Sequence, residues 1–473
     1  MKSDTPGNGN VTLTHKKAHS EREVAGVSKV VEQDANGELK RALTVSDLII
    51  YGMVYMLPIA PFALFGIIDK VAHGYVALAY IMSAVALSFT ARSYMVLSKE
   101  FPAAGSVYTY ATKGLGQVAG FFAGWLVFLD YIISPCILAV VSAAAMNSFF
   151  PAIPRWAWIF AFVGLGTSLN LVGVNITAKA NKIMLVAMLA LLVIFVVAGS
   201  IALYGGKGHG EITLASFYSP NTFRWGAIGT AVLLASTNVL GFDAITTLGE
   251  EVRHDHKHLL GFAGMATLVL TISLFVIQTW LATDLAPGAV IHSPDTAFYD
   301  IALYAGGPWL FALVSIGTAL SYGVPCAIVS QTAISRIIFA MGRDRQLPHI
   351  FARVGKKSQQ PYVANLFVAT VTLTVALFFQ NRLDELALFQ NFGAFGAFAL
   401  VNISVVGYFW VKKGARKIVP YLIMPIIGLT IIITLVVAMQ PATLHMGAIW
   451  LTIGIFYYLF QQKVLGRQVT LEV

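Results

Sequence analysis

Apolar residues in this chain run in long, nearly continuous stretches. A stretch of about 20 apolar residues is long enough to cross the hydrocarbon core of a bilayer as an α-helix. The pattern therefore predicts an all-α membrane protein with twelve transmembrane helices. They are expected near residues 44–68, 75–97, 118–148, 155–173, 180–203, 227–248, 259–283, 309–340, 361–379, 387–411, 418–439 and 443–462.

Two of these stretches contain residues that a membrane-spanning helix avoids. The first, "LIIYGMVYMLPIAPFALFGII", holds Pro58 and Pro61, and the second, "AIGTAVLLASTNVLGFDAITTL", holds Asn238, Gly241 and Asp243. Unwound backbone inside a membrane is tolerated only where it lines a cavity, and paired interruptions in two halves of a chain indicate a secondary transporter. We therefore expect the two breaks to mark the substrate site.

The composition agrees with a membrane protein. Hydrophobic residues make up 57% of the chain and charged residues 11%, against about 25% charged residues in ordinary soluble domains. If the N-terminus is cytoplasmic, only five of the 31 Lys and Arg residues lie on the outer side: Lys70, Arg155, Lys207, Arg224 and Arg382. The positive-inside rule thus predicts that both termini are cytoplasmic, in a multi-pass protein of the plasma or inner membrane. The net charge of +9 then follows from topology and contact with membrane lipid, and it gives no reason to expect nucleic-acid binding.

The tails, the cysteines and the polar runs of the chain show no pattern typical of an enzyme or a metal site. Residues 1–43 are polar and lack the apolar core of a signal peptide, so a flexible cytoplasmic tail is expected there, with a second tail at 463–473. Cys136 and Cys326 both fall inside predicted spans, which argues against a disulfide or a zinc site. The run "RHDHKH" at 253–258 is interpreted as a solvated loop and not as a metal site. We find no Walker loop, HExxH or GxSxG motif, and we expect neither enzyme activity, a bound metal nor a cofactor.

Several separated motifs resemble one known family. The segments "FPAAGSVYTYATKGLGQVAGFFAGW", "GFDAITTLGEE", "ISRIIFAMGRDRQLP" and "NFGAFGAFALVN" are similar to those of the amino acid–polyamine–organocation superfamily of transporters. Within it, "GSVYTYATK", "LDYIISP", "GFDAITTL" and "MGRDRQLP" are most similar to the bacterial putrescine importer branch. The resemblance implies a LeuT-like fold. Two inverted five-helix repeats, at 44–204 and 227–411, would precede helices 11 and 12 at 418–462, with substrate between the broken first and sixth helices.

The first break also bears on the substrate. Amino acid permeases of the superfamily usually have a glycine-rich first break whose backbone N–H groups hold a carboxylate, whereas this chain has "LPIAPFALFG". Proline supplies no N–H group, so an amine without a carboxylate is favoured. Ala63, however, stands where putrescine importers carry an acidic residue. The alternative hypothesis is therefore an amino acid permease that works as a symporter or an exchanger. The alternative from another functional class is a substrate sensor that does not transport.

Candidate site residues lie in and near the breaks. The acidic residues Asp130 and Asp243 lie deep in predicted spans, where a retained charge indicates an ion partner or a proton carrier. The alternatives are structural: a hydrogen bond from Asp130 to a neighbouring helix, and a cap of the second break by Asp243. Proton coupling is expected to use Asp243, Asp130 or Glu250, because Met188 stands near the point where some proton-coupled relatives carry a lysine. A monomer and a homodimer both remain open. The full set of expected substrate contacts is Tyr55, Pro58, Ile59, Ala60, Phe62, Ala63, Asp130, Tyr131, Asn238, Phe242 and Asp243.

Overall fold

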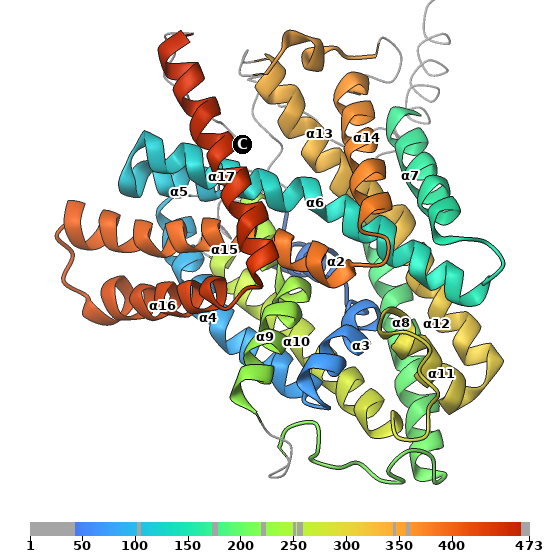
Figure 1. Cartoon of the computed structure of the whole chain (residues 1–473). Coiled ribbons are helices and arrows are strands. Elements are labelled where there is room, and N and C mark those ends of the chain that lie inside the picture. The colour runs from blue at the N-terminus through green and yellow to red at the C-terminus, as the bar shows by residue number, and fades with distance from the viewer. Residues whose placement is uncertain are drawn as a thin grey trace, which may run out of the picture.

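The structure is a computed structural model that describes residues 43–101, 106–172, 178–218, 224–248, 252, 259–343, 347–355 and 360–464. Helices dominate these ranges (Figure 1), and their single strand-type pairing is an isolated parallel bridge between Leu43 and Val252. Leu43 precedes the first interrupted stretch and Val252 follows the second. The bridge therefore brings one end of each interrupted stretch together. The expected N-terminal tail lies outside the described residues except for Leu43, and the expected C-terminal tail except for two residues.

The helices follow one another with few long connections. The first half holds α2 (Val45–Met56), α3 (Pro61–Ala72), α4 (Val76–Glu100), α5 (Ser106–Leu115), α6 (Gln117–Phe149), α7 (Arg155–Val172) and α8 (Ala178–Tyr204). Next come α9 (Trp225–Val239), η1 (Phe242–Leu248), α10 (Leu260–Leu285), η3 (Pro294–Thr296), α11 (Ala297–Gly306), α12 (Pro308–Ser321), η4 (Tyr322–Cys326) and α13 (Ala327–Arg343). The chain continues with η5 (His349–Ala352), α14 (Tyr362–Phe378), α15 (Leu383–Val405), η6 (Val406–Lys412), η7 (Val419–Ile423), α16 (Met424–Val437) and α17 (Pro441–Val464).

Each of the twelve apolar stretches folds as helix. In the described part of the chain, nine helices are long and apolar enough to cross a membrane, and the bent pair α2 and α3 makes a tenth. The stretches 155–173 and 361–379 form α7 and α14, which are shorter, at 18 and 17 residues. The sequence thus correctly predicted a helical protein with many membrane-spanning segments.

The 33-residue helix α6 runs through the middle of the molecule (Figure 1) and packs against α5, α7, α12, α13, α14 and α15. Its central position follows from its composition, because small residues such as Ala139, Ala143 and Ala145 let neighbouring helices approach closely and are themselves buried. Asp130 lies halfway along this helix. The fold therefore carries that carboxylate into the interior of the helix bundle.

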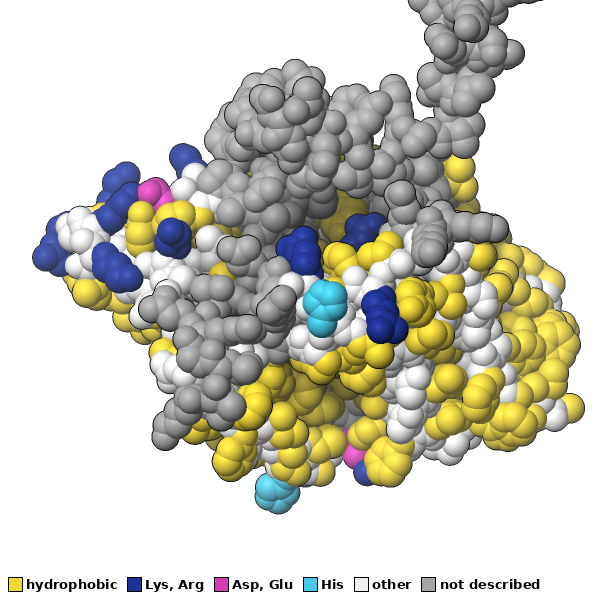
Figure 2. All heavy atoms as spheres, turned by 90° about the horizontal axis from the view of Figure 1, so that it is seen from above, with side chains coloured by type: hydrophobic (Ala, Val, Ile, Leu, Met, Phe, Trp, Pro, Cys, Tyr) yellow, Lys and Arg dark blue, Asp and Glu magenta, His cyan; other side chains and the backbone are white. Residues whose placement is uncertain are grey.

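The outermost helices carry the apolar surface that a bilayer would cover. Ile449, Phe456 and Phe460 on α17 are 61%, 69% and 53% exposed, and Val437 at the end of α16 is 71% exposed. Apolar side chains exposed to this extent suit contact with lipid tails. Figure 2 shows hydrophobic surface over much of the face that it draws.

Basic side chains gather where α15 passes into α16. Lys412, Lys413, Arg416 and Lys417 follow one another closely there, and Figure 2 shows Lys and Arg side chains clustered at the same end of the molecule. Lys413 forms an ion pair with Glu100 at the end of α4. The hydrogen bond and negative charge of that carboxylate raise the pKa of Lys413 above its ordinary value. This end carries the charge pattern expected beside an anionic membrane surface.

Candidate functional site

The first interrupted stretch breaks between α2 and α3, which are bent by 54° relative to each other. Helix α2 ends at Met56, Leu57 takes the positive φ of 54°, and α3 restarts with Pro61 at its first position. Pro58 and Pro61 explain the break, because a proline inside a helix removes a backbone donor and clashes with the preceding turn, yet suits a helix start. The freed carbonyls are satisfied from distant helices. Gln278 of α10 donates to the Pro58 oxygen at 2.9 Å, and Tyr322 of η4 donates to the Ala60 oxygen at 3.2 Å.

The first break offers few free backbone donors. The N–H groups of Leu57, Ala60 and Phe62 already donate to carbonyls within the break or at the end of α2, and the two prolines have none. In the described structure, the Ile59 N–H is the one donor of this segment that bonds to no backbone carbonyl, and the Ile59 side chain is fully buried. The arrangement does not provide the cluster of N–H groups that a carboxylate requires.

The second interrupted stretch breaks after α9, which ends at Val239. Gly241 adopts φ 110°, a conformation that favours glycine, and the 3₁₀ segment η1 begins at Phe242. A Cβ atom on Gly241 would lie 2.3 Å from the ring of Tyr55, so the glycine also allows the two breaks to touch. Asp243 lies in the first turn of η1 and accepts a hydrogen bond from the Tyr94 hydroxyl at 3.3 Å.

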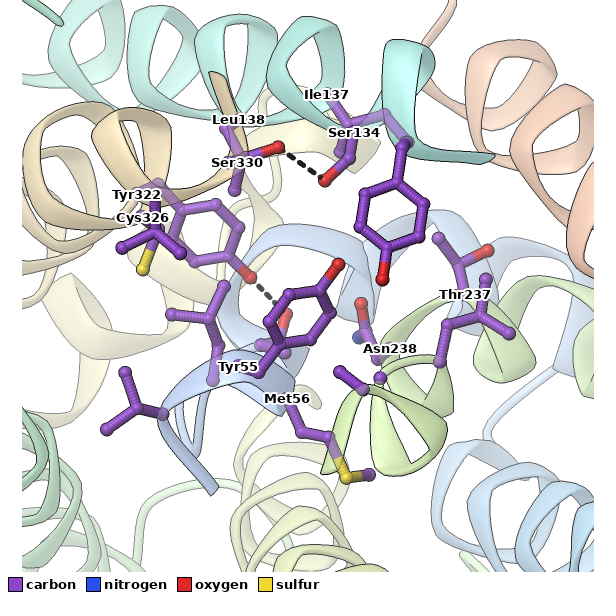
Figure 3. Close-up of a pocket in the computed structure, with 18 of the residues that line it drawn as sticks. Tyr55, Met56, Ser134, Ile137, Leu138, Thr237, Asn238, Tyr322, Cys326 and Ser330 are labelled. Carbon is purple, nitrogen blue, oxygen red and sulfur yellow. Dashed lines mark hydrogen bonds between the residues drawn. The ribbon is translucent and has the colours of Figure 1, made fainter. Parts of the chain in front are cut away.

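A cavity of about 110 Å³ lies between the two breaks (Figure 3). The lining comes from both broken stretches and from α6, α8, η4, α13 and α15, so segments far apart in the sequence form it together. Figure 3 shows Tyr55 among the side chains that face this space, with a hydrogen bond between Ser330 and Ser134 at one edge. Polar and aromatic members of the lining are Tyr51, Tyr55, Asp130, Tyr131, Ser134, Asn181, Thr237, Asn238, Asp243, Tyr322, Ser330 and Gln390.

The described lining of this cavity holds two acidic residues and no basic one. Asp130 and Asp243 come from different elements, and none of the described lining residues is Lys, Arg or His. Asp130 accepts one hydrogen bond, at 2.7 Å from the side-chain amide of Gln390. Four tyrosine rings complete the wall, and aromatic faces attract cations. The cavity is chemically suited to a small cation with hydrogen-bond donors.

Six of the residues predicted from the sequence line the cavity, and five do not. Those in the lining are Tyr55, Ala60, Asp130, Tyr131, Asn238 and Asp243. Those outside it are Pro58, Ile59, Phe62, Ala63 and Phe242, all of which are buried. Glu250, the third proposed proton carrier, lies outside the described residues.

The two phenylalanines beside the breaks pack into separate aromatic clusters. Phe62 stacks on Phe298 of α11 with a centroid distance of 4.1 Å. Phe242 contacts Tyr94 at 5.9 Å and Phe398 at 5.5 Å, joining η1 to α4 and α15. Each ring therefore packs a broken segment against neighbouring helices and does not face the cavity.

The structure adds lining residues that the sequence analysis did not name. Tyr322 and Cys326 belong to η4, a π-helical turn inside the long span from α12 to α13. Pro325, within that turn, is the sequence signal that could have identified a third interruption. Gln390, Thr237 and Ser330 carried no comparable signal, because single polar residues in apolar helices are common at helix contacts.

The described residues hold no group of three or more His, Cys, Asp or Glu side chains that could bind a metal ion. The run "RHDHKH" lies outside them.

Comparison with known proteins gives the class of this chain. The Amino acid permease family profile matches residues 42–460. The chain is 31% identical over 432 residues to the low-affinity putrescine importer PlaP of Escherichia coli strain K12, covering 89% of this chain and 93% of that protein. It is 26% identical over 453 residues to the branched-chain amino acid permease BcaP of Bacillus subtilis, covering 90% and 94%. It is also 27% identical over 396 residues to the vacuolar cationic amino acid transporter 2 of Arabidopsis thaliana, covering 79% and 60%.

The described residues thus form a helical membrane protein with a cavity between two interrupted helices. The chain belongs to the amino acid permease family of the amino acid–polyamine–organocation superfamily. It is a multi-pass membrane transporter of small molecules and not an enzyme. The resemblance seen in its motifs is thereby confirmed.

Proposed function

We propose that this transporter imports a small organic amine of the putrescine type across the cell membrane. The observation that carries the proposal is the charge of the cavity lining, in which Asp130 and Asp243 stand without any cationic side chain among the described lining residues. A protonated diamine carries an ammonium group at each end, and two carboxylates from different helices are suited to bind both. The printed function of the relative PlaP supports the same substrate class.

The helix ends at the cavity favour a cation as well. Tyr55 and Met56 close the C-terminal end of α2, and Thr237 and Asn238 lie in the last turn of α9. The C-terminal end of a helix carries a partial negative charge of about −0.5. Two such ends reinforce the two carboxylates in attracting an ammonium group.

A carboxylate on the ligand would be poorly served at the first break. Among the described residues, the Ile59 N–H is the one donor of this break that is not already bonded to a backbone carbonyl, and no described lining residue is basic. Burying an unpaired carboxylate costs more than the apolar contacts of a small ligand recover. An amine avoids this cost. The second candidate is an amino acid substrate, which the names of BcaP and the cationic amino acid transporter support.

We propose further that protons drive import by alternating access, with Asp243 and Asp130 as carriers. A carboxylate held inside a membrane protein can bind and release a proton along with an amine. The bundle would have twelve spans in two inverted repeats with both termini cytoplasmic, which the distribution of Lys and Arg supports. The first and sixth helices would move against the remaining scaffold. The oligomer would be a monomer or a homodimer.

Competition uptake in proteoliposomes tests the substrate class. Proteoliposomes containing the purified protein take up labelled putrescine under an inward proton gradient. Unlabelled competitors are compared in matched pairs, ornithine with putrescine and lysine with cadaverine, for their ability to reduce this uptake. We expect the amine to win each pair. If the amino acid wins each pair by tenfold or more, a difference of about 1.4 kcal/mol, the amino acid permease is the better description. Saturable binding without any flux would instead indicate a substrate sensor.

A further inference from the structure

A second cavity, of about 510 Å³, lies beyond the first along two shared helices. Its lining includes Thr230 and Leu234 of α9 and Asp384 and Leu388 at the start of α15. The rest of the lining comes from α3, the beginning of α7, the segments around Asp295 and Arg382, and Gln440, and it includes the basic residues Lys70, Arg155 and Arg382. We call it the outer cavity, and the one between the breaks the central cavity.

One face of α9 lines both cavities. Thr230 and Leu234 face the outer cavity, and Thr237 and Asn238 face the central one. Residues three or four positions apart lie on the same side of a helix. The two cavities therefore follow each other along this face, one helical turn apart.

On α15, the face that lines the outer cavity continues to a buried asparagine, Asn391. Asp384 and Leu388 line the outer cavity, and Asn391, three residues further on, continues their face. Asn391 is fully buried and lines neither cavity. Its side-chain nitrogen donates to the Leu233 carbonyl at 2.7 Å and to the Thr237 hydroxyl at 2.9 Å. It joins α15 to α9 at the wall between the cavities.

The other end of the same side chain is unsatisfied. The Asn391 Oδ1 atom is buried and has no hydrogen-bond partner among the described residues. Leaving a buried acceptor without a donor costs free energy, which a donor passing close to it would recover. An ammonium group crossing from one cavity to the other would bring the donor that this oxygen lacks.

We propose that Asn391 forms the polar part of the barrier between the outer and central cavities, and that its Oδ1 atom receives the ammonium group of the substrate in transit. This inference rests on the proposed amine import. An apolar wall would force the ammonium to shed water without compensation. The carboxamide holds the barrier shut through α9 and offers an acceptor when the barrier opens.

The test compares Asn391→Leu with Asn365→Leu. Leucine keeps the approximate volume and removes both polar atoms. Asn365 of α14 is a matched control, because it is also buried with an unpaired Oδ1 atom, but no described residue of its helix lines either cavity. We expect Asn391→Leu to lower the maximal import rate of putrescine at least tenfold with KM changed less than threefold. Asn365→Leu should keep at least half of the wild-type rate. Asn391→Asp, which keeps an acceptor oxygen, should recover part of the lost rate.

A binding measurement separates a transit role from a structural one. Putrescine binding to detergent-purified protein, followed by isothermal calorimetry, should stay within threefold of wild type in Asn391→Leu. The proposal is overturned if Asn391→Leu imports at the wild-type rate, or if its binding and import fall together. If the wild-type protein imports an amino acid and not an amine, the proposed function fails, and the same comparison with that amino acid decides the role of Asn391 separately.

Discussion

The hydroxyl of Tyr322 donates a hydrogen bond to the Ala60 carbonyl at 3.2 Å, across 262 residues of sequence. It joins the π-helical turn η4 to the break between α2 and α3, and both residues line the central cavity (Figure 3). The two irregular segments are thus coupled at the point where substrate is proposed to bind. A substitution in one segment is therefore expected to change the conformation of the other.

Tyr322→Phe should weaken substrate binding without unfolding the protein. The ring remains, but the hydrogen bond, which contributes about 1 kcal/mol, is lost, and the first break loses an anchor. We expect a two- to tenfold rise in the apparent KM for uptake. Tyr421→Phe serves as the control, since the Tyr421 ring stacks on Phe409 outside the cavity. An unchanged KM for Tyr322→Phe would show that this hydrogen bond does not shape the site.

Asp243→Asn should abolish or strongly weaken gradient-driven accumulation while the protein stays inserted and folded. The amide keeps the shape and can still accept from the Tyr94 hydroxyl, but it can neither carry a proton nor pair with an ammonium group. Uptake is measured in proteoliposomes with and without a proton gradient. Asp69→Asn on α3, outside both cavities, is the matched control. Normal accumulation by Asp243→Asn would leave Asp243 only a structural role in the break.

Cys326 provides a native probe of the central cavity. It lines the cavity and is partly exposed, whereas Cys136, the other cysteine in the sequence, is fully buried. Alkylation by a small maleimide should therefore modify Cys326 first, and saturating substrate should slow the modification severalfold. Mass spectrometry of the labelled peptides measures the rate, with Cys326→Ser and Cys136→Ser as controls. Equal labelling with and without a transported substrate would place the binding site elsewhere.

Arg155 should contribute more to stability than Arg382. The Arg155 guanidinium contacts Asp295 at 2.6 Å, the Gln380 carbonyl at 3.0 Å and the Asn381 side chain at 3.1 Å, and it is 15% exposed. Arg155→Gln leaves Asp295 partly buried without its charge partner, which should cost about 1–3 kcal/mol and lower the apparent melting temperature.

The control is another ion pair beside the outer cavity, between Arg382 and Glu385, in which the arginine side chain is 48% exposed. Arg382→Gln should change the melting temperature little, because exposed pairs are weak. The double variant Arg155→Gln with Asp295→Asn should lose less than the sum of the single variants, since the two residues interact directly. Additive losses would contradict the pairing.

Much of this protein could be read from local sequence. The apolar stretches give the helices, because hydrogen-bonding demands inside a membrane leave few other structures. Pro58, Pro61 and Gly241 give the two breaks, because their backbone preferences act within one helical turn. Asp130, Asn238 and Asp243 were found because polar residues in a span are costly and thus conspicuous.

Which side chains face the cavity was decided by the tertiary structure. Phe62 follows the first break directly, yet its ring stacks on Phe298, whereas Tyr322 reaches the cavity from a helix 260 residues away. The direction of a side chain beside a break depends on dihedral angles such as the φ of 54° at Leu57, and on partners such as Gln278 that hold the freed carbonyls. The sequence by itself determined the helices, the breaks and the family, since these depend on composition and local backbone chemistry. Only the packed bundle decided the wall of the cavity and the place of Asn391 between the two cavities, because contacts between distant helices set both.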